Sequence, residues 1–472
     1  MLRSMKGRQR ASRCLFIVVA VVIATAGQAW AGPPVFSTLA VLNTQAPGKT
    51  GVAWSVQVAS VSPGKWVAVW HSTNSLGDKI GRDWDILVSR SADGGVTWTP
   101  PRPLNTNAAV DRGNDRSPVV ASDGAGYLLA VWTSADPLGG KIGLDWDLLA
   151  ARSLDGGRTW TDPVPLNNNA AFDWGDDEDV RVRSDRKGGW LAVWHSTDSL
   201  GNTIGGDRDI LLARSRDGGK SWTPPVALNT NAAVDSGFDI SPRVATDTAG
   251  NWVAVWSSGD SLAGSIGLDR DVLTARSADG GASWSRPMPL NTNAAVDARA
   301  DWTPSVDSDA KGIWLAVWSS ADTLADTLGM DRDILVARST DQGASWTVPA
   351  ALNRSAGLDS REDSSPTIVC DRNGNWLTVW HSWDSFGEHL DVDADIFLSY
   401  SSDGGLGWSE PSTVNPGASE DDGDDVLPHV ATDGLGRWVA AWQAFALAGG
   451  KIGGFNTEWD ILTSSGSVAP GR

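Results

Sequence analysis

The feature that most constrains this chain is a motif that returns six times at a fixed interval of 62 residues. Its pattern is S-x-D-x-G-x-x-W, and the first copy runs from Ser91 to Trp98. The later copies begin at Ser153, Ser215, Ser277, Ser339 and Ser401. A strict period of this length indicates a repeat architecture, in which each unit buries its apolar face against the next.

The motif has the composition of a tight β-hairpin turn. Asp93 is placed to accept hydrogen bonds from nearby backbone N–H groups, and Gly94 and Gly95 allow positive φ angles. Trp98 follows the turn and is expected to pack on the sheet. The same structural role is predicted for the aspartate of every copy: Asp93, Asp155, Asp217, Asp279, Asp341 and Asp403.

These six motifs resemble the Asp-box, also called the bacterial neuraminidase repeat, of sialidases and several other β-propellers. The resemblance covers nearly all of the chain after residue 31 and implies an all-β propeller. In these families the Asp-box lies away from the active site. The resemblance therefore implies a fold rather than an activity.

Each period contains four strand-like segments bounded by Gly, Asp and Asn; in the third period they cover 179–184, 190–195, 209–214 and 222–228. No helical periodicity competes with them. The tryptophan that ends the second segment occurs seven times, at Trp70, Trp132, Trp194, Trp256, Trp318, Trp380 and Trp442. Seven blades are therefore predicted, although only six Asp-boxes exist.

The two ends of the chain supply complementary parts of the seventh blade. The third segment recurs at 459–462, and Ser465-Gly466-Ser467 then stands where an Asp-box is expected. Near the other end, Leu42-Asn43-Thr44 matches Leu104-Asn105-Thr106. The sequence thus predicts a seven-bladed β-propeller of four-stranded antiparallel blades, closed by the N-terminal strand pairing into the last blade.

The first 31 residues have the composition of a secretory signal. Five basic residues precede the apolar run from Leu15 to Ala26, and Ala29-Trp30-Ala31 follows it. That run is shorter than the roughly 20 residues of a membrane-spanning helix. We expect cleavage near Ala31 and export to the periplasm or the medium. Residues 32–472 are then expected to form one propeller domain, monomeric and without a membrane span.

Composition excludes several partners. The formal net charge is −19, which disfavours nucleic acid and anionic membranes. Cys370 is the only cysteine after residue 31, so no internal disulfide is expected. It is predicted to be a small buried side chain.

Two series of aspartates mark the loops on the face opposite the Asp-boxes. Asp-x-Asp pairs precede the third strands, and their first members are candidate calcium ligands: Asp83, Asp145, Asp207, Asp269, Asp331 and Asp393. A second series includes Asp111 with Asp115, Asp235 with Asp239 and Asp359 with Asp363. Ca²⁺ takes about six to eight oxygen ligands. The alternative, favoured because no full EF-hand or RTX loop is present, is that these aspartates cap loop N–H groups.

The repeats differ most where the first strand of each blade begins. Trp54, Arg116, Glu178 and Trp302 occupy aligned positions there, and Arg181, Arg243 and His429 lie three residues further along their own strands. Because the first strand of a blade lines the central channel, these seven residues are predicted to form one ligand pocket at its mouth. The alternative is a water-filled channel wall that tolerates polar variety.

Two functions fit these features. One is a secreted propeller that binds a glycan or another extracellular polymer on its Asp-rich long-loop face. The alternative is a glycoside hydrolase, either an exo-sialidase or a carboxylate-pair hydrolase acting on polysaccharide, with Glu178 as the catalytic candidate. The sialidase resemblance implies a tyrosine nucleophile. Tyr127 and Tyr400 are both predicted to lie on the Asp-box face, so that mechanism is not expected.

Overall fold

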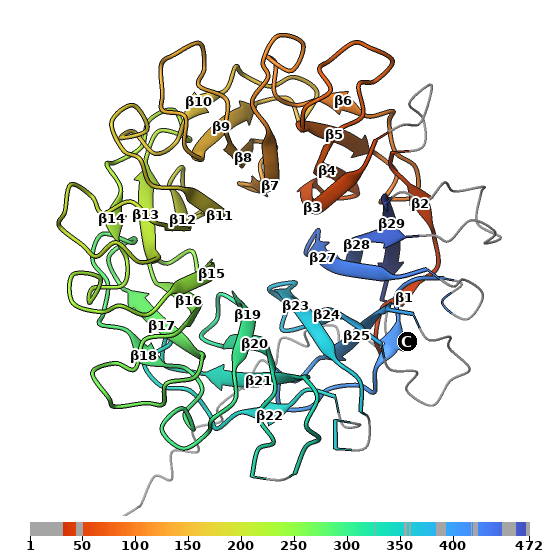
Figure 1. Cartoon of the computed structure of the whole chain (residues 1–472). Helices are drawn as coiled ribbons and strands as arrows, with labels where there is room; N and C mark the ends of the chain where they lie inside the picture. The colour runs from red at the N-terminus through yellow and green to blue at the C-terminus, as the bar shows by residue number, and fades with distance from the viewer. Residues whose placement is uncertain are drawn as a thin grey trace, which may run out of the picture.

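Seven antiparallel sheets form a closed ring around a central channel in this computed structural model (Figure 1). The structure describes residues 32–43, 51–325, 327–353, 356–357, 360–383, 393–416, 418, 423–445 and 459–468. These residues form strands, turns and bends, and none belongs to a helix of the length and hydropathy that spans a bilayer. The predicted signal segment and Asp359 lie outside the described residues. The predicted seven-bladed propeller is confirmed.

Every blade is built from strands in the same order from the channel outward. The innermost strands are β3 (Ala53–Ser62), β7 (Asp115–Ser122), β11 (Asp177–Ser184), β15 (Asp239–Thr246), β19 (Asp301–Ser308), β23 (Asp363–Cys370) and β27 (Asp425–Thr432). The second strands are β4 (Lys65–Ser72), β8 (Leu128–Ser134), β12 (Trp190–Ser196), β16 (Trp252–Ser258), β20 (Trp314–Ser320), β24 (Trp376–Ser382) and β28 (Arg437–Phe445). The third strands are β5 (Asp85–Ser91), β9 (Asp147–Ser153), β13 (Asp209–Ser215), β17 (Asp271–Ser277), β21 (Asp333–Ser339), β25 (Asp395–Ser401) and β29 (Trp459–Ser467).

The fourth strands are much shorter than the sequence predicted. They are β6 (Arg102–Pro103), β10 (Val164–Pro165), β14 (Val226–Ala227), β18 (Met288–Pro289), β22 (Ala350–Ala351) and β26 (Ser412–Thr413). In the third blade the predicted segment 222–228 shrinks to two paired residues. Pro224 and Pro225 precede this pair, and proline has no N–H to donate to a strand ladder.

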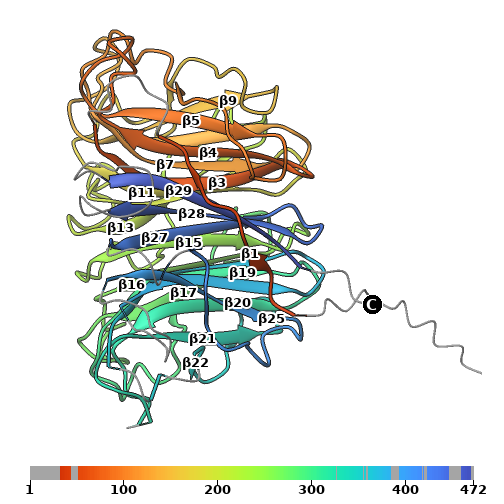
Figure 2. The ribbon, with the colours of Figure 1, turned by 90° about the vertical axis from the view of Figure 1, so that its right-hand side faces the viewer.

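The N-terminal residues close the ring. β1 (Val35–Phe36) and β2 (Ala40–Val41) pair antiparallel with β29 along the outer edge of the seventh blade (Figure 2). Asn43 donates to Asp460 at 2.8 Å and accepts from the backbone N–H of Ile461. Asn105 makes the same two bonds to Asp85 and Ile86 inside the first blade. The predicted closure is confirmed, and β29 continues through Ser467, further than predicted.

The core lies between consecutive blades. The seven tryptophans that end the second strands' apolar runs are completely buried: Trp70, Trp132, Trp194, Trp256, Trp318, Trp380 and Trp442. Trp194, for example, packs in one cluster with Val131 of β8 and Leu211 of β13. Cys370 is buried as predicted, and its backbone N–H donates to Asp307 at 2.8 Å. Because each apolar cluster joins neighbouring sheets, the ring positions the first strands rigidly around the channel.

The Asp-box turns have the predicted geometry. Asp93 accepts from the backbone N–H of Thr97 at 2.9 Å and from the hydroxyl of Ser91 at 2.8 Å. Gly94 and Gly95 have φ angles of 85° and 93°, in the region that favours glycine. Asp93 therefore accepts hydrogen bonds within its own turn.

Candidate functional site

A belt of aromatic and arginine side chains follows the mouth of the channel on the long-loop face. We call it the mouth belt, and its residues are Trp54, Trp84, Arg116, Trp146, Glu178, Arg208, Arg270, Trp302, Arg332 and Trp459. It combines residues near the start of the innermost strands with the central residues of the Asp-x-Asp loops and with Trp459, which holds the corresponding position in the seventh blade. In each Asp-x-Asp loop the backbone carbonyl of the central residue accepts from the first residue of the next innermost strand, as Trp84 accepts from Asp115 at 2.7 Å. These bonds link belt residues of neighbouring blades.

Several belt arginines lie over indole rings. The guanidinium of Arg116 is centred 3.4 Å from the ring centroid of Trp146. Arg270 lies 4.7 Å and Arg332 5.9 Å from the ring centroid of Trp302. Such stacking holds a guanidinium in one orientation while leaving its N–H edge available to a ligand. On the other side of the mouth, Trp54 packs against Trp459 at 5.5 Å between ring centroids.

Glu178 is the carboxylate embedded in this belt. Its Oε2 lies 3.6 Å from Arg208 and 3.7 Å from His195, which is its neighbour across the β11–β12 ladder. Hydrogen bonding to His195 is the main cause that lowers the pKa of Glu178, and the positive charges of Arg208 and Arg116 add to it. Glu178 is therefore an ionised, partly exposed acceptor, already engaged by cations.

A β-bulge separates the two columns of predicted ligand residues. In β11 the register shifts between Glu178 and Arg181, and every other innermost strand has the same irregularity. In all seven innermost strands the residue that follows Glu178 or its equivalent has a positive φ angle without being glycine: Ser55, Ser117, Asp179, Ser241, Thr303, Ser365 and Leu427. Bulges re-aim side chains. Here the bulge directs residue 179 and its equivalents into the channel and leaves residue 178 and its equivalents in the belt.

The channel below the belt holds a buried charged network. Asp179 lies 2.8 Å from Arg181 and 3.4 Å from Arg243, which reaches it from the next blade. Burial alone raises the pKa of Asp179, but the two arginines outweigh burial and lower it. Arg183 lines the same cavity, whose volume is about 260 Å³. This part of the channel thus has more cationic than anionic groups.

His429 joins the last blade to the first. Its Nδ1 accepts a hydrogen bond from the backbone N–H of Val58 at 3.3 Å. Burial, together with the charges of Arg183, Arg181 and Arg243, lowers the pKa of His429 to about 3. His429 is therefore neutral at physiological pH and serves as an acceptor across the closing junction.

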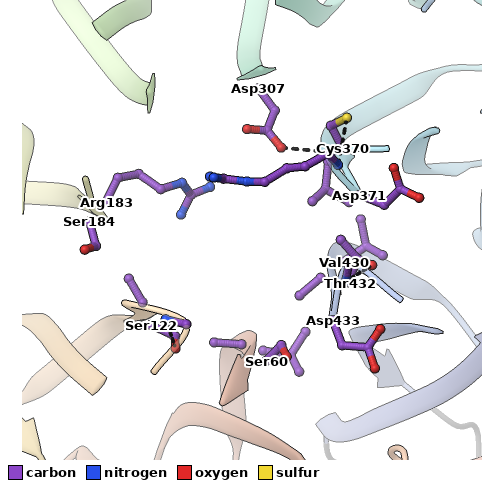
Figure 3. A pocket seen from close by; sticks show the side chains of 18 of the residues that line it. Ser60, Ser122, Arg183, Ser184, Asp307, Cys370, Asp371, Val430, Thr432 and Asp433 are labelled. Carbon is purple, nitrogen blue, oxygen red and sulfur yellow. Dashed lines mark hydrogen bonds between the residues drawn. The ribbon is translucent and has the colours of Figure 1, made fainter. Parts of the chain in front are cut away.

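The opposite end of the channel has its own lining (Figure 3). Arg183 extends into it from β11, and Asp307 accepts from the backbone N–H of Cys370. The cavity there has a volume of about 240 Å³. Burial raises the pKa of the Cys370 thiol strongly, so this cysteine is an inert neutral group rather than a nucleophile.

The seven predicted ligand residues are split between two layers. Arg181, Arg243 and His429 line the channel cavity. Trp54, Arg116, Glu178 and Trp302 are not among its lining residues and lie in the mouth belt instead. The sequence treated the two columns as one pocket because it gave no sign of the bulge between them.

The predicted calcium ligands lie further out on the same face. Asp83 and Asp85 come within reach of Asp111 from the following linker, and their ligand atoms lie within 4.8 Å of one another. The same grouping occurs around Asp145, Asp207 and Asp269. Asp331 and Asp393 stand at the equivalent positions of the fifth and sixth blades.

The family model of the BNR repeat-like domain matches residues 64–375, well over half of the chain. The chain belongs to the BNR repeat-like family. Among solved structures, an ulvan lyase from a new family of polysaccharide lyases aligns with a TM-score of 0.51 at 15% identity, over 92% of this chain and 94% of the lyase. The identity is low, so this likeness shows the shared propeller fold.

Two further structures align less closely with this BNR repeat-like propeller. The Hadza microbial sialidase gives a TM-score of 0.45 at 18% identity, over 70% of this chain and 63% of the sialidase. The chain thus spans less than two thirds of that sialidase's length. The α-L-arabinanase of Penicillium chrysogenum gives 0.45 at 16% identity, over 91% of this chain and 98% of the arabinanase.

Both tyrosines of this BNR repeat-like propeller lie on the Asp-box side, as predicted. The hydroxyl of Tyr127 donates to the backbone carbonyl of Gly218 in the third Asp-box. The hydroxyl of Tyr400 donates to Asn375 at 2.8 Å, and burial raises its pKa. Each tyrosine hydroxyl therefore has a hydrogen-bond partner at the Asp-box end of the propeller, away from the mouth belt.

The sequence analysis missed six of the ten mouth-belt residues, one of which is Trp459 at the start of β29. The other five are central residues of Asp-x-Asp triplets, in which only the flanking aspartates were predicted as ligands: Trp84, Trp146, Arg208, Arg270 and Arg332. The sequence does contain a pattern that marks these central positions. The flanking aspartates repeat while the central residue changes from Trp to Arg around the ring, which marks a position under a different constraint.

Proposed function

We propose that this protein is an exported propeller that binds an acidic polysaccharide across the mouth of its channel. The observation that carries the proposal is the pair of stacked guanidinium groups of Arg116 and Arg270. Each is held on an indole ring, and no described carboxylate forms a salt bridge with either. A guanidinium fixed in this way presents parallel N–H donors to a carboxylate or sulfate group.

The local charge of the belt supports an anionic ligand. Four arginines contribute to it, and the carboxylates that contact them are Glu178 and Glu362. The belt is therefore a cationic area on a protein whose formal net charge is −19. Because exposed charges are screened beyond about 10 Å at ordinary salt, this local excess decides what binds at the mouth.

The extent of the belt favours a polymer over a monosaccharide. Its members come from consecutive blades around the ring, beginning at Trp459 in the seventh, passing Trp54 in the first and ending at Arg332 in the fifth. Trp54 is 37% exposed, which leaves part of its indole surface open to a sugar ring. The fold is also shared with an ulvan lyase, a polysaccharide lyase.

Binding is better supported than hydrolysis. A carboxylate-pair hydrolase needs one carboxyl group that stays protonated to act as the general acid. The predicted catalytic candidate Glu178 and its neighbour Asp179 each have a pKa that is lowered by the cations around them. Both groups are therefore ionised, and neither suits that role.

The test is a glycan array with purified mature protein, followed by titration of the best ligand. We expect uronate- or sulfate-bearing polymers to bind and their neutral counterparts to bind much more weakly. Arg116→Ala and Trp302→Ala should each weaken binding by about tenfold, equivalent to 1.4 kcal/mol. Arg158→Ala is the matched control, since Arg158 is an exposed arginine in an Asp-box on the opposite face. Equal losses for Arg158→Ala and Arg116→Ala would contradict a belt-centred site.

Turnover is checked with the same ligands. We expect no new reducing or unsaturated ends after prolonged incubation with stoichiometric protein. Release of product that is lost in Glu178→Gln would overturn the binding proposal in favour of the hydrolase.

A further inference from the structure

Four junctions between consecutive blades contain the same group of acidic side chains. Each group takes two aspartates from an Asp-x-Asp loop and a third from the linker that leads to the next blade. We call these groups the seam sets; they are Asp83, Asp85 and Asp111; Asp145, Asp147 and Asp173; Asp207, Asp209 and Asp235; and Asp269, Asp271 and Asp297. Within each set the potential ligand oxygens lie within 4.8 Å of one another.

An asparagine in the linker ties each set to the following blade. In the first seam Asn107 donates to Asp136, which lies in the next blade, at 2.6 Å. In the second seam Asn169 donates both to Asp173 of the set and to Asp198 of the next blade, at 2.6 and 2.7 Å. The third and fourth seams repeat these bonds through Asn231 and Asn293. The sets are therefore built junctions with fixed partners.

Each set contains buried oxygens that accept no hydrogen bond. Asp85 is 1% exposed; its Oδ1 accepts from Asn105 at 2.9 Å, whereas its Oδ2 has no donor. The Oδ2 of Asp83, the Oδ1 of Asp111 and the side-chain carbonyl of Asn107 also have no donor. The same atoms are without a donor in the other three sets: Oδ2 of Asp145, Asp207, Asp269, Asp147, Asp209 and Asp271, Oδ1 of Asp173, Asp235 and Asp297, and the carbonyls of Asn169, Asn231 and Asn293.

This pattern differs from ordinary loop capping. Buried polar atoms in folded proteins nearly always find a partner, because leaving one unpaired costs free energy. Four unpaired oxygens at one place, repeated at four seams, indicate a shared partner that is not part of the polypeptide. In the described part of the chain no Lys or Arg forms a salt bridge with any seam-set aspartate.

The sets also concentrate negative charge. Three carboxylates whose oxygens lie within 4.8 Å oppose one another's ionisation unless a counter-charge is present.

We propose that each seam set binds one Ca²⁺ ion, held by its three aspartates and the side-chain carbonyl of the linker asparagine, and that these ions join consecutive blades. All the available ligands are oxygens, which excludes the nitrogen and sulfur environment that zinc prefers. Ca²⁺ fits better than Mg²⁺ because it accepts irregular geometry and several carboxylates, whereas Mg²⁺ requires a near-ideal octahedron and retains water. The inference does not depend on the proposed glycan.

The junction between the last blade and the first supplies an internal contrast. Asn43 and Gly51 correspond to Asn105 and Gly113, since they make the equivalent contacts with Asp460 and Asn74. In the aligned sequence between them, Gln45 and Lys49 correspond to Asn107 and Asp111 of the first seam. This junction therefore lacks the acidic set, and no ion is expected there.

The first test measures calcium binding to the metal-stripped mature protein by titration calorimetry. We expect at least four sites per chain, with dissociation constants of about 10⁻⁴ to 10⁻³ M, as in other extracellular calcium modules. Calcium at 5 mM should raise the melting temperature by about 5–10 °C over the chelated protein, and Mg²⁺ should raise it much less. Absence of saturable binding up to 10 mM calcium would overturn the proposal.

Variants separate a calcium ligand from a structural aspartate. Asp111→Asn should lower the number of sites by one and reduce the calcium-dependent rise in melting temperature, without lowering the melting temperature in chelator. Asp173→Asn tests the second seam in the same way. The matched control is Asp155→Asn in an Asp-box, which should lower the melting temperature equally with calcium and with chelator. Unchanged stoichiometry in both seam variants would overturn the proposal.

Discussion

Asp155 on the Asp-box face and Asp147 on the long-loop face stand at the two ends of the same blade. Asp155 accepts from Ser153 and from the N–H and hydroxyl of Thr159, at 2.7–2.9 Å. Asp147 accepts from Asn167 at 2.7 Å on one oxygen and has no donor on the other. For Asp155 the hydrogen bonds outweigh burial and lower the pKa to about 2, whereas burial raises the pKa of Asp147 to about 7.

The difference teaches that the supply of donors, rather than the residue type, determines what a repeated aspartate does. An Asp-box turn encloses its carboxylate with the N–H and hydroxyl groups of its own next four residues. A seam set gathers carboxylates from separate loops and provides too few donors for them. The first arrangement is complete within the chain, and the second requires a ligand.

The Asp-box end and the long-loop end also differ within the seventh blade. It has no Asp-box, because β29 continues through Ser467 and pairs there with Val35. It keeps the buried bond between Asn43 and Asp460 on the long-loop side. The Asp-box can therefore be replaced by strand pairing, whereas the Asn–Asp bond is retained where the ring closes.

The largest expected effect is that of calcium removal on the long-loop face. At free calcium 100 times the dissociation constant, each site stabilises the native state by about 2.7 kcal/mol, and four sites by roughly 10. Denaturant titrations with calcium and with chelator measure the total stabilisation by the four ions. Hydrogen exchange shows which part of the protein is stabilised: amides of 73–84 and 105–114 should exchange about 100-fold faster in chelator, and the exchange rates of the turn 91–98 should change little. Equal changes on both faces would remove the contrast between them.

The next largest effect is that of removing the closing strand. Deletion of residues 32–43 takes away Leu42 and Phe36, and burial of two such side chains contributes about 3–5 kcal/mol. It also exposes the edge of β29, so we expect a lower denaturation midpoint and aggregation at high concentration. Addition of a synthetic peptide of residues 32–43 should restore part of the stability. A truncated protein as stable as the full chain would show that the closure is dispensable.

Much of this architecture could be predicted because it depends on local periodicity. The spacing of Trp70 and its equivalents predicted seven blades, and the match of Asn43 to Asn105 predicted the closure. Both features repeat in the sequence, so they are visible without knowledge of the fold.

The site could be predicted only in part because it depends on departures from regular strands. The bulge at Asp179 separates Glu178 from Arg181, and its positive φ angle occurs at Ser, Thr, Asp and Leu, residue types that give no warning of it. The seam sets bring Asp83 next to Asp111, which lies well beyond it in the sequence. That approach depends on how two loops fold together, which periodicity does not describe.

A single Asp-box contributes less than the seam ions or the closing strand. Asp155→Ala removes the acceptors of several hydrogen bonds in an exposed turn, and we expect a loss of about 1–3 kcal/mol. The loss should be the same with calcium and with chelator, because the turn lies on the face without seam sets. Denaturant titration in both conditions is the measurement, and Asp123→Ala, in a turn on the same face, is a comparison. A calcium-dependent loss would mean that the two faces are coupled.

The smallest expected effect is on the acid stability of that same Asp-box. The folded-state pKa of Asp155 is about 2, below its ordinary value of 3.8. A carboxyl group with a depressed folded pKa contributes stability above its unfolded pKa and loses it as the pH falls through the folded pKa. The difference in melting temperature between the parent protein and Asp155→Asn should therefore be constant above about pH 5 and shrink by about 1 °C between pH 4 and pH 2. Calorimetry of the two proteins side by side measures this difference, in which contributions from the long-loop face cancel because both proteins share them. A difference that grows on acidification would mean that the folded pKa is raised, and that the Asp-box aspartate resembles a seam aspartate after all.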